Sequence, residues 1–536
     1  MIGRKRFHPW IAWLFLVVFS IALLGQRLGR TGLWTDESIY AQTAREMARS
    51  GDWITPTLCH RPYLIKPPLY YWLAGTAFAM VGENELAARL PQALSGLAAV
   101  LFVGWAAGRV FSRKKSWLAG AALLTSPGFF MGARVAGMDV LLLLCISVTL
   151  IAFFEGYRHA ARRRPWMLLA GLFAGIGALA KGPLGFFIPA LVVLIFLIWR
   201  GELRLLFSRV VLEGCLVALL TASVWYAPVW LRHPENFTRV FWLSNNLARI
   251  AEPVSEHSGP PIYYIPIFLF AFLPWSFPFV VALWRALRRI WREGRRSPPE
   301  DLFLLIWFVA PFVFYSAIAT KLPGYLLPVF PAAALLLARE WDDERERARR
   351  RAGAFPVACA LGVLALPGVA LAVPFLLRYR YQLQPERIWL FPAVTFALAL
   401  LAALAALLRR GRFRALLAVA AAGVFVLGLY QFVVIPTEPD ESMKAMGVKL
   451  MKYREAGFPV ALAGPHLKGT LFYTDCSASN PRDLKDLPRP GPGLPVYCLV
   501  KDRFKRDLEA WAEHRRFHLR EARRSGAVSL VEVSWE

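Results

Sequence analysis

Apolar runs recur along most of this chain and are separated by short polar connections. A membrane-spanning helix needs about 20 predominantly apolar residues, and on this criterion we predict roughly thirteen spans. The runs begin near Pro9, Leu86, Trp117, Met138, Trp166, Gly182, Val210, Tyr263, Asp301, Leu322, Ala354, Ile388 and Ala415. The pattern predicts an all-α, multi-span membrane bundle.

One further apolar segment, PPLYYWLAGTAFAMVG, begins at Pro67 and is excluded from this count. If it spanned the membrane, every later basic cluster would lie on the outer side. Its start carries Tyr70, Tyr71 and Trp72, and aromatic side chains are enriched at membrane interfaces. We therefore predict an interfacial or re-entrant helix within an outer loop of residues 26–85.

Composition and charge support a membrane protein. Of 536 residues, 57% are hydrophobic and only 18% are charged, which excludes a soluble multidomain protein. The net charge of +27 is carried largely by short clusters between apolar runs, such as RHAARRR and RALRRIWREGRR. Such clusters mark cytoplasmic connections, whereas a nucleic-acid surface needs one continuous basic face. The first run follows MIGRKR without a cleavage pattern, which predicts an uncleaved signal-anchor.

The chain after about residue 436 is more polar and alternates helix-like with strand-like stretches. With the span count above, it lies outside the membrane. About 100 residues suffice for a small domain with its own core. We therefore predict a transmembrane domain over residues 1–435 and a periplasmic α/β domain over residues 436–536.

The six cysteines show no metal-site spacing. Cys145, Cys215 and Cys359 lie inside apolar runs and are expected to be inert. Cys476 and Cys498 lie in the C-terminal region, where an extracytoplasmic location would allow a disulfide between them.

Basic residues favour the cytoplasmic connections of membrane proteins, which is the positive-inside rule. Three lysines depart from it because each lies at the outer end of an apolar run. Lys66, Lys181 and Lys321 all stand beside proline or glycine. A single lysine there is typical of a snorkelling anchor. Three with the same local setting favour an anion site, which Arg249 could join.

Carboxylates are predicted on the same side. Thr35 is a good N-cap for a helix with Asp36 and Glu37 in its first turn, and Ser50-Gly51 ends that helix. The two acids either complement the helix dipole or serve chemistry. Asp139 opens another span from the outside, where a helix cap is again an alternative.

Together, these residues are suited to group transfer at the membrane. Carboxylates can accept a proton or orient a nucleophile, and cations can hold a phosphate leaving group. A lipid-linked phosphate bearing a transferable group would fit a cavity at this outer surface.

The first 340 residues or so resemble the C-superfamily (GT-C) glycosyltransferases that use polyprenyl-phosphate sugars. The resemblance is greatest to bacterial aminoarabinose transferases of lipid A and to protein O-mannosyltransferases. It rests on TDESIYAQTAREMARSGDWITP, KPPLYYWLAG, GENELAARLPQALSGL, ALAKGPLGFFIPAL and TKLPGYLLPVFPAAALLLA, in this order. The motifs are specific for the superfamily and not for a substrate.

This resemblance implies an inverting transfer at the outer face of a bacterial inner membrane. Asp36 matches the acidic residue with the central catalytic role, and Glu37 is its neighbour. Asp139 matches a second acidic position. Lys66 matches a lysine that contacts the donor phosphate.

The remaining motif residues have less defined roles. Lys181 and Lys321 carry over as further donor-phosphate residues. Tyr40 and Tyr70 stand where the family lines its cavity with aromatic side chains.

One departure puts a metal cofactor in doubt. In the aminoarabinose transferases a glutamate precedes the KPPL lysine and can bind a metal together with a histidine of a later outer loop. This chain has Ile65 at the first position, and His257 stands roughly at the second. No other cofactor is implied.

We therefore predict transfer of a sugar from undecaprenyl phosphate to a lipid A, protein or glycan acceptor. The alternative is a transporter or lipid-sugar flippase. Transporters place charges near the bilayer midplane and often contain inverted repeats, whereas the charges here gather at outer ends. A non-catalytic relative that binds envelope polymers is a third interpretation, against which the intact acidic and lysine motifs argue.

Overall fold

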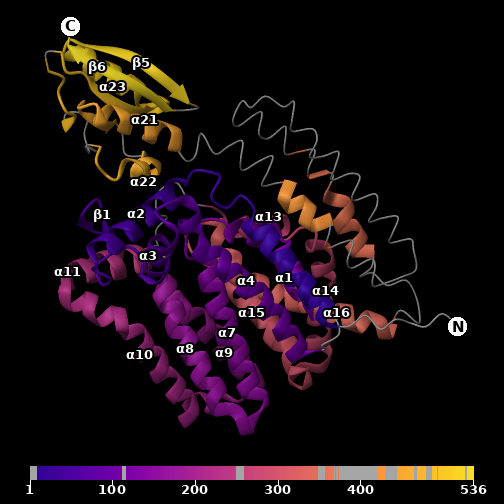
Figure 1. The fold of residues 1–536 in the computed structure, drawn as a ribbon. Helices are drawn as coiled ribbons and strands as arrows, with labels where there is room; N and C mark the ends of the chain where they lie inside the picture. The colour runs from indigo at the N-terminus through magenta and orange to yellow at the C-terminus, as the bar shows by residue number, and fades with distance from the viewer. Residues whose placement is uncertain are drawn as a thin grey trace.

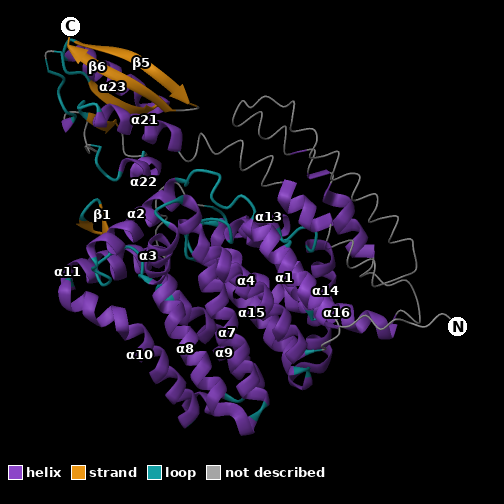
Figure 2. Ribbon diagram, in the orientation of Figure 1, coloured by secondary structure: helices purple, strands orange, loops and turns teal. Residues whose placement is uncertain are grey.

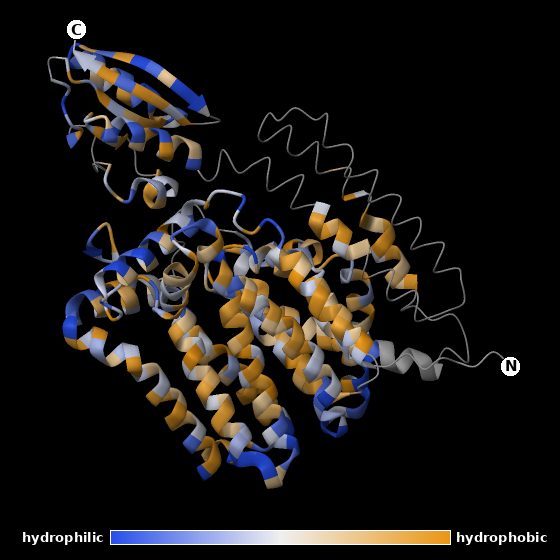
Figure 3. Ribbon diagram, viewed as in Figure 1, coloured by the Kyte–Doolittle hydropathy of each residue, from blue (hydrophilic) through white to orange (hydrophobic). Residues whose placement is uncertain are grey.

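The computed structural model describes residues 9–111, 116–248, 259–347, 357–366, 368–369, 372, 419, 421–428, 443–463, 467–478, 486–491, 493–525 and 528–535. A bundle of helices carries a smaller part with a β-sheet at one end (Figures 1 and 2). The bundle is largely apolar along its helices, and polar residues gather in its connections (Figure 3).

The bundle is built from apolar helices joined by short connections. Its helices are α1 (Pro9–Gly25), α4 (Glu85–Val110), α5 (Trp117–Leu124), α6 (Pro127–Gly132), α7 (Asp139–Arg158), α8 (Arg163–Lys181), α9 (Leu184–Arg200), α10 (Arg209–Arg232), α13 (Tyr264–Ala271), α14 (Ser276–Glu293), α15 (Pro299–Ala317) and α16 (Phe330–Arg347). The large core is shared by most of them. This arrangement makes the chain a predominantly helical membrane protein.

The expected number of spans is not confirmed. Within the described residues, α4, α7, α10 and α15 are long and apolar enough to cross a membrane, and α13 with α14 forms a pair bent by 119°. The run expected from Trp117 is split into α5 and α6 at Pro127, because proline lacks the amide that would continue a helix. The run from Ile388 lies outside the described residues.

The segment excluded from the span count forms α3 (Leu69–Val81), a helix of 13 residues. It packs against α2 (Thr35–Ser50) through a core that includes Tyr70, Tyr71 and Ala44. At 1.5 Å per residue it is about 20 Å long, shorter than the hydrocarbon layer of a bilayer. A two-stranded hairpin, β1 (Thr57–Leu58) and β2 (Arg61–Pro62), lies between α2 and α3.

The C-terminal part contains a four-stranded sheet in the order β3-β4-β6-β5. Its strands are β3 (Val460–Ala463), β4 (Val496–Lys501), β6 (Val528–Trp535) and β5 (Phe517–Ser525); β3 and β4 are parallel and the other pairs antiparallel. Alternate side chains of β4 face two separate cores: Leu499 packs with α21 (Lys444–Glu455), and Cys498 packs with α23 (Asp502–His514). The two helices therefore cover opposite faces of the sheet.

The short helix α22 (Leu471–Thr474) joins this part to the bundle by lying on α2 (Figure 1). Just beyond α22, Cys476 forms a disulfide with Cys59 of the β1–β2 turn. The bond between Cys476 and Cys498 that the sequence left open is therefore not formed. Cys498 is buried on β4 with its side chain on the face that packs against α23.

Candidate active site

Helix α2 begins and ends close to where its sequence predicts. Its N-cap is Trp34 rather than Thr35, and the amide of Trp34 is bound by the Glu37 carboxylate at 2.9 Å. Gly51 closes the helix in the left-handed conformation, with its amide donating to the Met47 carbonyl. Asp36 is exposed in the first turn, whereas Glu37 is buried, so the two neighbouring acids have different surroundings.

Glu37 is buried and fully engaged. Its two oxygens accept hydrogen bonds from Nε and Nη2 of Arg89 at 2.8 and 2.7 Å, and both side chains are at least 96% buried. They also accept from the backbone amides of Ala136 (2.6 Å) and Trp34. Glu37 therefore joins the start of α2 to α4 and to the turn before α7. The expectation of a catalytic role for Glu37 is replaced by a structural one.

Arg89 was not recognised as important from the sequence. Its Nη1 atom donates to the carbonyls of Leu28 and Thr31, and its Nη2 atom donates to Gly32. The backbone that leads into α2 is therefore held by one buried guanidinium. In the sequence, Arg89 lies near the outer end of a long apolar helix, where the positive-inside rule disfavours arginine. This departure from the rule is the signal that could have identified Arg89.

A second group of charged residues lies at the start of α7. Asp139, the first residue of α7, forms an ion pair with Lys181 at the end of α8. The Lys181 ammonium also lies 5.0 Å from the centre of the Tyr325 ring, in the 3₁₀ segment Pro323–Val329. The Asp139 side chain is 37% exposed. Since Glu37 binds the turn just before α7, this pair lies on the same side of the bundle as Asp36.

Lys321 has a different environment from Lys181. Its ammonium donates to the carbonyls of Tyr315, Ser316 and Ile318 at 3.2, 2.6 and 2.5 Å, and the residue is 3% exposed. The last carbonyls of a helix lack partners within it, and a positive charge is favourable there. Lys321 is thus the C-terminal cap of α15, and its ammonium binds these carbonyls in place of the donor phosphate expected from the sequence.

Replacing Lys321 by methionine is expected to lower thermal stability without changing the KM for a lipid-linked donor. The change keeps the apolar stem but leaves buried carbonyls without a donor, which costs about 1–3 kcal/mol. Thermal unfolding in detergent and donor titration measure the two effects. The matched variant Lys66→Met should instead raise the donor KM. Equal KM increases in both variants would contradict the capping role.

The remaining predicted site residues lie on α2, on α3 and in the loop before α3. Lys66 is half-buried in the loop before α3. Tyr70 is fully buried and donates to the Ala88 carbonyl at 2.8 Å, so it packs the interior rather than lining a cavity. Tyr40 is half-buried, with its ring 6.2 Å from that of Tyr70. Arg249 and His257 lie outside the described residues.

No cluster of three histidine, cysteine, aspartate or glutamate residues that could hold a metal occurs in the described part of the chain. Ile65 offers no ligand atom. No residues are therefore assigned to a metal, and the candidate site consists of the charged groups described above.

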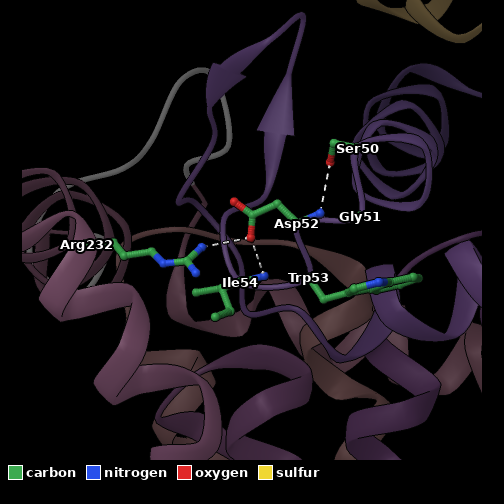
Figure 4. A pocket seen from close by; sticks show the side chains of 6 residues that line it. All are labelled: Ser50, Gly51, Asp52, Trp53, Ile54 and Arg232. Atoms are coloured by element: carbon green, nitrogen blue, oxygen red, sulfur yellow. Dashed lines mark hydrogen bonds and ion pairs between the residues drawn. The ribbon is translucent and has the colours of Figure 1, made fainter.

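A surface pocket of about 520 Å³ lies at the other end of α2, where Asp52 and Arg232 form an ion pair at 3.0 Å (Figure 4). Burial acts to raise the pKa of Asp52, but the amides of Ile54 and Thr55 and the nearby Arg232 outweigh it and lower that pKa. Asp52 is therefore a stable anion. The end of α2 at Ser50 lies about 21 Å from Asp36 along the helix axis, so this pocket is separate from the candidate site.

Comparisons with known proteins identify the chain's relatives. Residues 65–227 match the family model described as dolichyl-phosphate-mannose-protein mannosyltransferase. The undecaprenyl phosphate-alpha-4-amino-4-deoxy-L-arabinose arabinosyl transferase of Pseudomonas savastanoi is 33% identical over 67% of this chain and 68% of its own length. The protein of the same name from Aeromonas salmonicida is 32% identical over 67% of this chain and 66% of its own length.

Solved structures share the fold. The crystal structure of ArnT from Cupriavidus metallidurans bound to undecaprenyl phosphate matches with a TM-score of 0.77 and 23% identity, over 98% of both chains. The Archaeoglobus fulgidus oligosaccharyltransferase matches with a TM-score of 0.57 over 94% of this chain and 70% of its own. This chain therefore belongs to the family of the aminoarabinose arabinosyl transferases and is a membrane glycosyltransferase of the GT-C class, which uses a lipid-phosphate sugar donor.

Proposed function

We propose that this chain transfers a sugar, 4-amino-4-deoxy-L-arabinose or a close analogue, from undecaprenyl phosphate to lipid A. Its relatives carry this donor and sugar in their names. The observation that carries the proposal is the exposed Asp36, held beside a buried Glu37–Arg89 pair on the side of the bundle that also presents Asp139 and Lys181. These charges gather at one end of the bundle, whereas transporters place theirs near the bilayer midplane.

In this mechanism an acceptor oxygen attacks the anomeric carbon from the face opposite the phosphate. Asp36 orients the acceptor or takes its proton. The bond between the anomeric carbon and the phosphate oxygen breaks, and polyprenyl phosphate leaves with the electron pair. The configuration at the anomeric carbon is therefore inverted.

Lys66 stabilises the departing phosphate, and Lys181 can join it only when the phosphate competes with Asp139 for its ammonium. Fixed charges in a low-dielectric site supply several kcal/mol of such stabilisation. If the acceptor is a lipid A phosphate, it is already ionised, and Asp36 acts mainly by orientation. Protein and glycan acceptors would need the proton transfer.

In this proposal the site lies at the periplasmic face of the inner membrane. The basic clusters between apolar runs favour a cytoplasmic location for the opposite end of the bundle. A disulfide between Cys59 and Cys476 suits an oxidising compartment. In this proposal residues 1–435 form the transmembrane domain and residues 436–536 form the periplasmic domain.

The test is transfer by the full-length protein in proteoliposomes containing undecaprenyl-phosphate aminoarabinose and lipid A. Mass spectrometry should detect lipid A carrying the added sugar, and an equal release of undecaprenyl phosphate. Parallel samples receive a protein or glycan acceptor instead. Movement of the donor between leaflets without any sugar transfer would contradict the proposal and support the flippase alternative.

A further inference from the structure

The short helix α22 contacts α2 along one face with its backbone and side chains. The Phe472 amide donates to the Ser38 hydroxyl at 3.0 Å, and Arg45 donates to the Phe472 carbonyl at 2.6 Å. Asp475 then forms ion pairs with Arg45 at 3.2 Å and Arg49 at 2.8 Å. The C-terminal part is therefore attached to the same helix that presents Asp36.

The side chain of Tyr473, on α22, contacts the backbone segment that precedes α2. Its hydroxyl accepts a hydrogen bond from the Leu33 amide at 2.6 Å and donates to Glu85 at 3.2 Å. Glu85 is in turn paired with Lys444 of α21 at 2.6 Å. Leu33 itself is fully buried, so the Tyr473 hydroxyl is the partner of a buried backbone amide.

The backbone just before Asp36 is thus held from two directions. Arg89 binds the carbonyl of Gly32 from within the bundle, and Tyr473 binds the amide of Leu33 from the C-terminal part. Asp36 follows Leu33 by three residues. A shift of this segment would therefore move the Asp36 carboxylate, although α2 itself would stay folded.

We propose that Tyr473 is a positioning residue for Asp36, so that the C-terminal part completes the active site rather than serving only as an attached domain. This inference rests on the proposed role of Asp36. Displacing a catalytic group by about 1 Å can cost up to a hundredfold in rate. Tyr473 acts on the chemical step and contacts no substrate.

The experiment compares Tyr473→Phe with Tyr497→Phe in the full-length protein. Tyr497 is a matched control because its hydroxyl also lies near a carboxylate, Glu532, at 3.4 Å, but within the C-terminal sheet. We expect Tyr473→Phe to lower kcat roughly tenfold to a hundredfold, with the donor KM little changed. Tyr497→Phe should retain wild-type kcat. A wild-type kcat in Tyr473→Phe, or equal losses in both variants, would overturn the inference.

Loss of docking must be distinguished from loss of positioning. In Tyr473→Phe, Cys59 and Cys476 should still resist maleimide labelling without reductant, which reports that the segment after α22 came close enough to the β1–β2 turn during folding for the disulfide to form. If they become reactive, the hydroxyl is needed for docking, and the positioning role is overturned in favour of a structural one.

A second comparison uses Asp36→Glu, which keeps the carboxylate but moves it by one methylene. If Tyr473 acts through Asp36, the double variant should lose little more than Asp36→Glu alone, because groups that act as a unit are not additive. Fully additive losses would overturn the inference. Wild-type transfer by Asp36→Glu and by Asp36→Asn would instead overturn the proposed function of Asp36.

Discussion

Replacing Asp36 by asparagine is expected to reduce sugar transfer by about a hundredfold where Asp36 only orients an ionised acceptor, and by up to about ten-thousandfold where it also takes the acceptor's proton. The amide keeps the size of the side chain but cannot accept the acceptor's proton or carry its charge. The protein should still fold, because Asp36 is exposed and its loss removes only a helix-dipole interaction of about 0.3–1 kcal/mol. Transfer in proteoliposomes and thermal unfolding in detergent measure the two properties.

Asp52→Asn is the matched control for this variant. It removes the same charge just beyond the opposite end of α2, where Asp52 binds Arg232. Transfer by Asp52→Asn should stay near the wild-type rate. If Asp36→Asn is folded and equally active, Asp36 has no catalytic role. If both variants fail equally, the loss comes from the helix as a whole.

Replacing Glu37 by alanine is expected to destabilise the protein by about 3–5 kcal/mol, because it leaves the buried Arg89 charge without its partner. Two backbone amides, of Trp34 and Ala136, also lose their acceptor. The expected result is low yield in membranes and a lower temperature of thermal unfolding. Transfer activity should fall with the amount of folded protein and with the disorder of the segment before Asp36.

Glu83→Ala is the control for burial. Glu83 also binds an arginine through two hydrogen bonds, to Arg49 at 2.8 and 2.6 Å. Its side chain is 32% exposed and that of Arg49 50%, and pairs of this kind contribute about 0–1 kcal/mol. Similar losses of stability in Glu37→Ala and Glu83→Ala would show that the buried pair has no special importance.

Local signals in the sequence predicted the elements around the site well. Helix α2 follows from the acidic residues after Thr35 and from Gly51, and α3 was excluded from the spans by charge bias. These features depend on neighbouring residues, which a sequence displays directly. The family and the class of reaction were also predicted, because the motifs lie in order along the chain.

Contacts between distant residues were not predictable in the same way. Lys181 and Lys321 have similar sequence surroundings, yet one faces Asp139 and the other turns back onto α15. The direction of a long side chain depends on which carbonyls and carboxylates are near it after folding. The sequence pattern therefore identified a set of lysines but not their separate roles.

The two adjacent acids show the same limit. Glu37 meets Arg89 from 52 residues away, and nothing in the residues around Asp36 and Glu37 shows which acid is covered. The disulfide pairing stayed open for a related reason. Cys476 and Cys498 are near in sequence, but β4 turns the latter toward α23. Arg249 and His257 remain predictions.

The bond between Cys59 and Cys476 also bears on how the protein is made. These residues are 417 positions apart, and at about 5–20 residues per second a ribosome needs roughly 20–80 s to synthesise the intervening chain. During that interval the first loop has no partner for its thiol, and Tyr473 does not yet exist to bind Leu33. Partly synthesised chains would therefore lack both the disulfide and the hydrogen bond that holds the backbone before Asp36, and both form only when translation is nearly complete.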